Sequence, residues 1–223
     1  MRVAIAGVLL VLGACRNDTP TSNETLAPVK VTYATSPGSL RGFLYRPKGV
    51  GPFPAVVFNH GSERDASNMF GQAMFYVPHG FVLFVPHRRG QGESADAGEY
   101  LDDVWNRSGR DPARIVELLD AHVDDVAAAV AYVRRLPYVD RSRVAVVGCS
   151  LGGIQALLAA ERDQGLRSAI DFAGAAILWS QVAPLRERMK RAARSARVPV
   201  FFVQAENDFD TSPSRVLSEE MRR

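Results

Sequence analysis

The chain has 223 residues, of which 47% are hydrophobic and 23% are charged, a composition typical of a soluble globular domain. Its formal net charge of +3 is too small to indicate a nucleic-acid-binding protein. We therefore expect small-molecule chemistry or protein partners, and no nucleic acid.

The first 14 residues have the pattern of an export signal. Arg2 precedes an apolar run over residues 3–12, which is too short to span a bilayer and is typical of a signal peptide. The run ends in Leu-Gly-Ala-Cys, which resembles the lipobox of bacterial lipoproteins. This resemblance implies cleavage before Cys15, lipidation of Cys15, and an exported protein anchored to membrane by lipid at the bacterial cell envelope. The alternative is an ordinary signal peptide with an incidental cysteine.

Residues 15–28 are polar and rich in Thr, Ser, Asn and Pro, which predicts a flexible tether between the anchor and a domain over residues 29–223. The chain has two cysteines. With Cys15 acylated, only Cys149 remains, so no internal disulfide is expected.

From residue 29 onward, strand patterns alternate with helix patterns. Two short patterns come first and look like paired strands at a sheet edge, and longer apolar runs favour buried parallel strands. The predicted strands are 29–35, 42–47, 53–61, 80–92, 143–150, 173–180 and 198–205. The predicted helices are 112–136, 151–163, 183–196 and 212–223. This order predicts an α/β fold, a mostly parallel central sheet with helices on both faces.

Residues 93–111 form the one long irregular segment expected inside the domain. Long loops are more often functional than idle, so a lid or a substrate-facing insertion is expected there. Farther along, the basic residues of 186–197 share a predicted helix with apolar residues, which predicts a solvated helix face. Attraction of this face to anionic lipid is the alternative.

Residues 148–152 read Gly-Cys-Ser-Leu-Gly, a G-x-S-x-G pattern between a predicted strand and a predicted helix. A nucleophilic serine in such a turn has a strained backbone, and small residues two positions before and after it let strand and helix pack closely. Only Ser150 has glycines at both positions. Ser150 is therefore the predicted nucleophile and Cys149 a small packing residue. The alternative is a plain glycine-rich turn.

A serine that attacks a carbonyl group needs hydrogen-bond donors for the oxyanion that forms. In a turn of this kind, the backbone N–H of the next residue, Leu151, is one donor, and a loop after an earlier strand supplies the other. Residues 59–62, Asn-His-Gly-Ser, follow an apolar run and resemble such a loop, so Ser62 is the predicted second donor. His60 is expected to orient this loop through hydrogen bonds, and a role as a surrogate base is the alternative.

Taken together, the chain resembles α/β-hydrolases of the dienelactone hydrolase and prolyl-oligopeptidase-like group. The likeness is carried by residues 59–62, 80–94 and 137–153 and covers the chain from about residue 29 to its end. It implies a serine hydrolase that acts on small-molecule carboxylic esters or related acyl bonds, with no cofactor and no metal. Dienelactone hydrolase itself has Cys where this chain has Ser150, so that enzyme's substrate is not implied.

The resemblance also implies an acid in the turn over residues 205–213. Asp208 matches the family's G-x-x-D turn and is the expected acid, with Asp210 as the alternative. This acid would orient a histidine and stabilise its cation. The family's histidine follows one more strand, but no histidine occurs after His122, and only 15 residues follow Asp208. We therefore expect an α/β-hydrolase domain cut off before its last strand and histidine loop.

Three functional interpretations remain open at this stage. The chain is a serine esterase, or a truncated homologue without activity, or a peptidase, which ranks below an esterase because no gating domain is recognisable. His79, His87 and His122 are predicted to be structural. A missing last strand would expose an apolar sheet edge, which predicts poor solubility or marginal stability.

Overall fold

The computed structural model describes residues 26–36, 38–162 and 165–223. The predicted signal peptide, Cys15 and most of the predicted tether lie outside these residues. The described strands are β1 (Val29–Thr35), β2 (Gly38–Tyr45), β3 (Phe53–Asn59), β4 (Val82–Pro86), β5 (Val139–Cys149), β6 (Ser168–Phe172) and β7 (Val200–Val203). The described helices are α2 (Phe70–Tyr76), the 3-10 helix η3 (Gly92–Ala97), α3 (Leu101–Arg107), α4 (Pro112–Arg134), α5 (Leu151–Ala160), α6 (Ala183–Ser195) and α7 (Ser212–Glu220).

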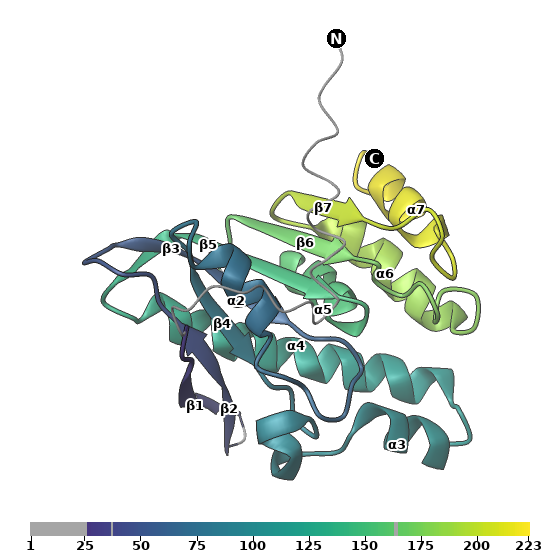
Figure 1. Cartoon of the computed structure of the whole chain (residues 1–223). Coiled ribbons are helices and arrows are strands. Elements are labelled where there is room, and N and C mark those ends of the chain that lie inside the picture. The colour runs from purple at the N-terminus through teal and green to yellow at the C-terminus, as the bar shows by residue number, and fades with distance from the viewer. Residues whose placement is uncertain (1–25, 37, 163–164) are drawn as a thin grey trace.

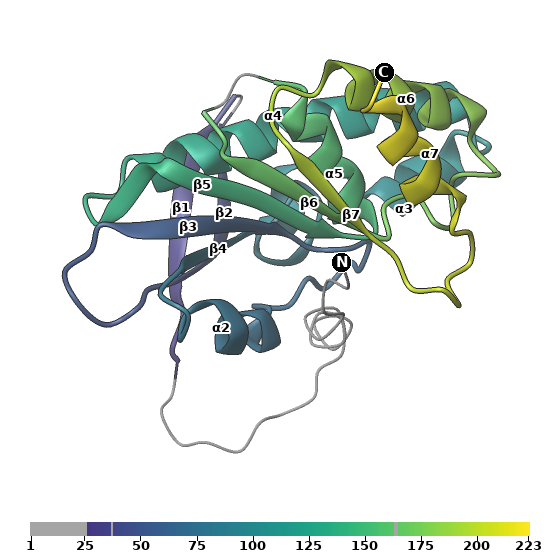
Figure 2. The ribbon, with the colours of Figure 1, turned by 90° about the horizontal axis from the view of Figure 1, so that it is seen from above.

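The described strands form one sheet in the order β1-β2-β4-β3-β5-β6-β7. Strands β1 and β2 are antiparallel at one side, and the strands from β4 to β7 are all parallel to one another. Helices α4, α5 and α6 cover one face of the sheet, and α2 lies on the other (Figures 1 and 2). The predicted α/β fold with a mostly parallel sheet is confirmed.

The central strands have apolar side chains on both faces. On β3, Val57 packs with the residues of α4 and α5, whereas its neighbours Val56 and Phe58 pack on the α2 side. Strand β4 does the same, with Phe84 on one side and Leu83 on the other. Successive side chains of a strand point to opposite faces of the sheet. A strand that contributes to a core on each face therefore needs a continuous run of apolar residues. This explains why the sequence predicted these strands correctly.

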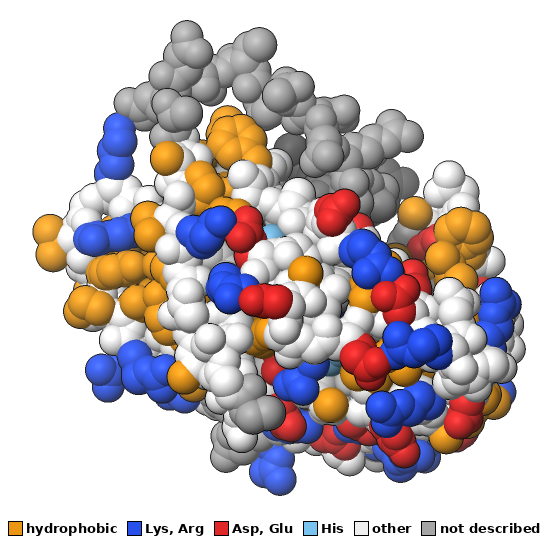
Figure 3. All heavy atoms as spheres, turned by 90° about the horizontal axis from the view of Figure 1, so that it is seen from below, with side chains coloured by type: hydrophobic (Ala, Val, Ile, Leu, Met, Phe, Trp, Pro, Cys, Tyr) orange, Lys and Arg blue, Asp and Glu red, His pale blue; other side chains and the backbone are white. Residues whose placement is uncertain are grey.

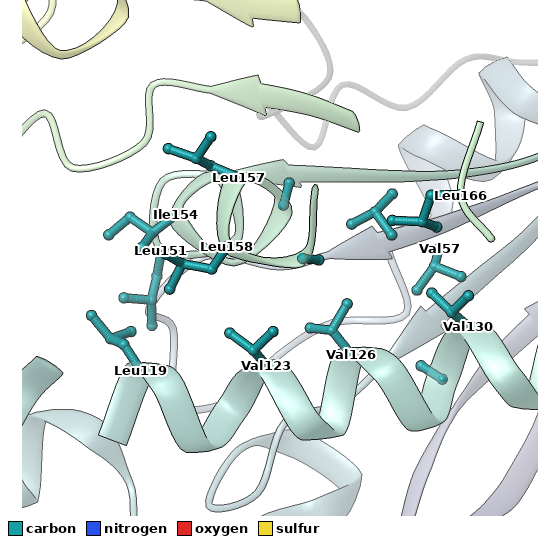
Figure 4. Packing of buried hydrophobic residues seen from close by; sticks show 14 of the residues in the cluster. Val57, Leu119, Val123, Val126, Val130, Leu151, Ile154, Leu157, Leu158 and Leu166 are labelled. Carbon is teal, nitrogen blue, oxygen red and sulfur yellow. The ribbon is translucent and has the colours of Figure 1, made fainter. Parts of the chain in front are cut away.

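Helices α4 and α5 build the larger core. Figure 4 shows Leu119, Val123 and Val126 of α4 directed toward Leu151 and Leu158 of α5. These α4 positions recur at the three- to four-residue spacing of one helix face. Every residue of α5 is buried, so this helix is enclosed between α4, α6 and the sheet.

Several predicted elements differ from the structure in their bounds. Strand β4 ends at Pro86, six residues before the predicted end at 92, and β5 begins at Val139, four residues before the predicted start. The strand predicted over residues 173–180 is wrong, because β6 is Ser168–Phe172 and the chain then turns. Ala173 and Ala175 have φ angles of +54° and +64°, which no strand accommodates. The apolar residues of the turn resemble a strand only because Trp179 and its neighbours are buried in the core.

Strand β2 begins at Gly38 rather than at residue 42, since it pairs with β1 along its whole length. The segment predicted as irregular, residues 93–111, contains most of η3 and all of α3. The seven-residue helix α2 was not predicted at all, because its Phe-Gly-Gln-Ala-Met-Phe-Tyr sequence is too short to show a helical period.

Ion pairs fasten η3 and α3 to the rest of the domain. Glu93 pairs with Lys30 of β1 at 2.7 Å, and Asp96 pairs with Arg41 of β2 at 2.6 Å. Acidic and basic side chains are interspersed over the face seen from below, on which α3 lies (Figure 3). Ser94 is fully buried, and its Oγ accepts a hydrogen bond of 2.8 Å from the Arg41 N–H. The segment is therefore a packed wall of the domain.

Candidate active site

Ser150 occupies the sharp turn between β5 and α5. Its φ and ψ angles are 55° and −116°, a left-handed backbone that costs a non-glycine residue about 1–3 kcal/mol. A β-carbon on Gly148 would overlap the carbonyl oxygen of Gly152, and one on Gly152 would overlap that of Asn59. The close approach predicted for the two glycines is therefore present, and it packs the elbow against the end of β3.

Hydrogen bonds fix the backbone of the turn. The Ser150 N–H donates to the Phe172 carbonyl at 2.8 Å, while the Ser150 carbonyl accepts from Gly153 and Ile154 at 2.9 and 3.2 Å. Within the described part of the chain, Ser150 Oγ has no hydrogen-bond partner. Cys149 is half-buried and packs with the core on the α2 side, in line with its predicted packing role.

Ser150, Leu151 and Ser62 line one cavity of about 270 Å³. The structure thus brings together the predicted nucleophile and the two residues predicted to supply oxyanion donors. Leu151 is the first residue of α5, where backbone N–H groups have no partner within the helix. Ser62 arrives from the loop after β3, which Gly152 holds close to the elbow. Acyl transfer requires a carbonyl group whose carbon faces Ser150 Oγ and whose oxygen faces these donors.

Side chains from a distant segment hold the Ser62 loop in place. Arg88 Nη2 donates to the carbonyls of His60, at 2.9 Å, and Gly61. Gln91 Nε2 donates to the Glu63 carbonyl at 2.6 Å, and Tyr100 OH donates to the Ser62 carbonyl at 2.5 Å. Four consecutive carbonyl groups are therefore fixed by side chains. Their bonds determine how this loop presents its N–H groups.

Arg88, Gln91 and Tyr100 were not predicted as site residues. Arg88 is only 2% exposed, and burial lowers its pKa to about 10, so it still carries its charge at neutral pH. Its Nε also donates to Gln91 Oε1 at 3.0 Å. The signal in the sequence was an arginine two residues after a fully apolar strand. A cation buried at such a place requires several hydrogen-bond acceptors.

His60 has a structural role in this arrangement. It is fully buried, with Nε2 3.4 Å from the backbone nitrogen of Arg88, and Nδ1 3.0 Å from Arg88 Nη2 and 3.1 Å from the Gly61 carbonyl oxygen. Burial, and next the charge of Arg88, lower the pKa of His60 well below its usual range. His60 does not line the Ser150 cavity, so the geometry gives no support to a surrogate base.

The other three histidines are also distant from the cavity lining. His87 accepts from the Glu93 N–H at 2.8 Å and donates to the Ser67 carbonyl at 3.1 Å, and His79 Nδ1 lies 2.6 Å from the Phe75 carbonyl. His122 is fully buried in α4, and burial lowers its pKa to about 3. Within the described residues both ring nitrogens of His122 lack a hydrogen-bond partner, so the predicted structural role has contacts behind it only for His79 and His87.

Asp208 and Asp210 lie in the turn between β7 and α7, at the same edge of the sheet as Ser150. Asp208 accepts hydrogen bonds from the Phe209 N–H at 2.8 Å and from Gln204 Nε2 at 3.3 Å. Asp210 accepts from the Ser212 N–H at 2.8 Å, next to the start of α7. Neither carboxyl group lines the Ser150 cavity. An acid of this kind contacts the histidine rather than the serine, so the choice of Asp208 over Asp210 stays a prediction.

The predicted solvated face of the basic run is found on α6. Arg191 and Arg194 are exposed, and the apolar residues Leu185 and Met189 are buried beneath. Arg188 is an exception, because its side chain is only 12% exposed and pairs with Asp120 and Glu161 at 2.9 and 2.6 Å. No group of His, Cys, Asp and Glu side chains in the described ranges is suited to hold a metal ion. A search of the same ranges for a helix with the length and hydropathy of a membrane span found none.

Comparison with protein families gives one match over most of the chain. The model of the Dienelactone hydrolase family matches residues 40–222. The chain is 27% identical over 152 residues to the quorum-quenching protein AidA of Acinetobacter baumannii (strain MDR-ZJ06), covering 67% of this chain and 44% of that protein. It is 29% identical over 161 residues to the thiohydrolase apmlB of Arthrinium phaeospermum, covering 71% of this chain and 47% of that one. The chain thus spans less than half the length of each relative.

Solved structures share the fold. A putative dienelactone hydrolase from Klebsiella pneumoniae superimposes with a TM-score of 0.66 at 15% identity, over 89% of this chain and 81% of that one. The acylaminoacyl peptidase of Pyrococcus horikoshii gives a TM-score of 0.66 at 17% identity, over 89% of this chain and 35% of that one. Identities this low show a common architecture and nothing finer.

Proposed function

Because this chain belongs to the dienelactone hydrolase family of the α/β-hydrolases, we propose that it hydrolyses carboxylic esters or related acyl bonds of small molecules, with Ser150 as the nucleophile. The observation that carries the proposal is the strained turn of Ser150 in a cavity that Ser62 and Leu151 also line. The name of the thiohydrolase relative fits an acyl bond of this class.

In the proposed reaction, Ser150 Oγ attacks the carbonyl carbon and its proton passes to a base. The oxyanion that forms accepts hydrogen bonds from the Leu151 and Ser62 N–H groups. Loss of one such donor slows acyl transfer by about 10²–10³-fold in a well-studied serine protease. The leaving alcohol takes up a proton, and water then releases the acyl group from Ser150. No metal or cofactor takes part in this proposal.

The base determines how fast the chain reacts. None of its four histidines lines the cavity, and an unassisted serine hydroxyl is a weak nucleophile at neutral pH. An oxyanion hole and substrate binding alone still give roughly 10³–10⁴-fold acceleration over water. We therefore propose slow turnover, with Asp208 as the acid of any histidine that acts at this site.

A catalytically inactive homologue is the second candidate, and it is favoured by the absence of histidine from the cavity lining among the described residues. Peptidase activity ranks third, because the peptidase neighbours share only the architecture.

For all three candidates, we propose export and a lipid anchor at Cys15. If Cys15→Ser incorporates no labelled fatty acid while the unchanged chain does, the anchor is supported, and equal incorporation contradicts it.

A fluorophosphonate probe tests the nucleophile directly. We expect slow covalent labelling, located at Ser150 by peptide mass spectrometry, together with slow hydrolysis of a simple aryl ester. Ser150→Ala should abolish both. The matched control is Cys149→Ala, which changes the adjacent side chain and should leave labelling intact. Labelling that survives Ser150→Ala contradicts the assignment, and absence of both labelling and hydrolysis favours the inactive homologue.

A further inference from the structure

The walls of the Ser150 cavity are mainly apolar and come from four separate segments. Leu101 and Trp105 lie one turn apart on α3, Ile115 projects from α4, Ile154 from α5, and Leu178 from the turn after β6. The α3 residues belong to the 93–111 segment, which was expected to face the substrate. Because Leu101 is buried in the larger core and Asp103 of α3 pairs with Arg64 at 2.6 Å, this part of the wall is packed against the domain.

The size of the cavity limits what it holds. Its volume is about 270 Å³. An engineered protein cavity of about 150 Å³ binds one benzene ring, so at the same volume per atom this one has room for about eleven non-hydrogen atoms. Two ester oxygens and one carbon of a small alcohol take about three of these places, which leaves roughly eight for the carbons of the acyl group. That space accommodates a medium-length alkyl chain or a substituted ring, and it is too small for a long fatty acyl chain.

The charges in the lining have opposite signs. Asp102 and Arg110 are its two ionisable residues, and Asp102 Oδ2 accepts a hydrogen bond of 2.9 Å from Tyr100 OH. With no net charge, the lining offers little attraction to a carboxylate or an ammonium group. Burying a charged group against Ile115 and Ile154 would also cost its hydration.

We propose that this cavity binds an uncharged, apolar acyl group of up to about eight carbons, which sets the substrate class as neutral medium-chain or aryl esters. The inference rests on the proposed function, since it places the carbonyl carbon beside Ser150 and the acyl group in the cavity that Ser150 lines. The oxyanion donors, Leu151 and Ser62, line the same cavity.

Methyl n-alkyl ketones test the cavity without catalysis. They carry a carbonyl group and a neutral chain, and in the Ser150→Ala protein they form no covalent adduct. In isothermal titration calorimetry we expect the dissociation constant to fall about fourfold for each added methylene and to level off near eight carbons. Alkanoate ions of equal length should bind at least tenfold more weakly.

Two variants locate the binding to this cavity. Ile154→Phe fills space and should move the plateau to shorter chains, while Trp105→Ala opens space and should move it to longer ones. Ile154 is 1% exposed, so the larger ring also risks misfolding, but the half-buried Trp105 gives an independent test. Val50→Phe, at a residue 88% exposed in the loop before β3, is the matched control and should change nothing.

The proposal of hydrolysis at Ser150 and the proposal of an acyl-binding cavity can be contradicted independently of each other. Affinity that does not depend on chain length, or alkanoates that bind more tightly than ketones, overturns the acyl-group assignment whatever the fluorophosphonate probe shows. A plateau near eight carbons that shifts with Trp105→Ala supports the assignment even if Ser150 proves unreactive. In that case the cavity is a binding site for such groups, and only the proposed hydrolysis is lost.

Discussion

One buried carboxyl group makes the stability of the domain depend on pH. Asp171 of β6 is 1% exposed and accepts a hydrogen bond of 2.8 Å from the Gly174 N–H. Burial raises its pKa to about 7, so the neutral acid is the favoured form in the folded protein. It pairs in register with Gly148, two residues before the nucleophile.

The direction of this dependence follows from proton binding. The unfolded state loses its Asp171 proton near pH 4 and the folded state near pH 7, so the folded state binds more protons between these values. The free energy of unfolding should therefore fall as pH rises from about 4 to 7 and level off above, by at most about 4 kcal/mol. Asp171→Asn keeps the acceptor oxygen and should flatten this slope in urea unfolding at several pH values. Parallel slopes in the two proteins would exclude Asp171 as the cause.

Arg88 gives a second prediction at the scale of one residue. Arg88→Met removes the donor of the His60 carbonyl and one of the contacts of the Gly61 carbonyl, and it also leaves Gln91 Oε1 without its Arg88 partner. Each buried group left unsatisfied costs about 1–3 kcal/mol. We expect a loss of about 2–5 kcal/mol in the free energy of unfolding and slower probe labelling at Ser150. Arg114→Met removes an exposed ion pair with Glu117 and should cost less than about 1 kcal/mol, which makes it the control. Equal losses in the two variants would contradict the role of Arg88.

Some site residues can be recognised within one short stretch of sequence, whereas others act through contacts with residues far away in the chain. Ser150 and Leu151 were identified from glycine spacing, because the elbow is built from five consecutive residues. The bonds from Arg88 to the Ser62 loop join residues 27 and 28 positions apart, and Tyr100 reaches Ser62 across 38 positions. A pattern within one segment carries no record of such contacts. The sequence therefore predicted the position of the turn at Ser150 and not the network that supports the Ser62 loop.

At the scale of elements, the junction of β5 and α5 depends on the absence of side chains. Gly152→Ala would raise helix propensity by about 1 kcal/mol, yet its β-carbon would overlap the Asn59 backbone. We expect net destabilisation and loss of labelling, because neither backbone segment can move alone. Gly80→Ala is a control with open space and a φ of +81°, where only backbone strain, of order 1 kcal/mol, applies. A Gly152→Ala protein as stable as the unchanged chain would refute the steric argument.

The sequence predicted helices and strands well where only one kind of structure explains the pattern of apolar side chains. Strand β4 is apolar at every position because both its faces are buried, and the 23 residues of α4 extend over several periods. The turn after β6 is apolar because it covers the end of the core, not because it is a strand with two buried faces. A short stretch of sequence looks the same in both cases. Helices α2 and α3 have seven residues each, too few to establish a period.

At the scale of the whole molecule, β7 ends the sheet that the described residues form. Phe201 on this strand is 63% exposed. An exposed apolar edge strand promotes pairing between chains, so we expect association that rises with protein concentration, in keeping with the predicted poor solubility. Phe201→Lys should reduce it in sedimentation or light-scattering measurements.

Phe209 provides the matched control for this prediction. It is 83% exposed and has the same apolar ring as Phe201, but it lies in the turn after β7 and not in a strand. Phe209→Lys should leave the association of the chain nearly unchanged. Equal effects of the two substitutions would indicate that exposed aromatic surface, rather than the strand edge, drives association.

The order β4-β3-β5 at the centre of the sheet has a consequence for the evolution of specificity. After β3 the chain moves to one side to form β4 and then crosses to the other side to form β5, so the loops that follow β3 and β5 part at the carboxyl ends of their strands. Open α/β sheets bind ligands at such a topological switch point. The backbone path alone therefore creates the crevice that holds Ser62 and Ser150. The segment over residues 93–111 contributes walls but no strand, so its replacement would change the shape of the Ser150 cavity, and with it the proposed substrates, without changing the turn at Ser150.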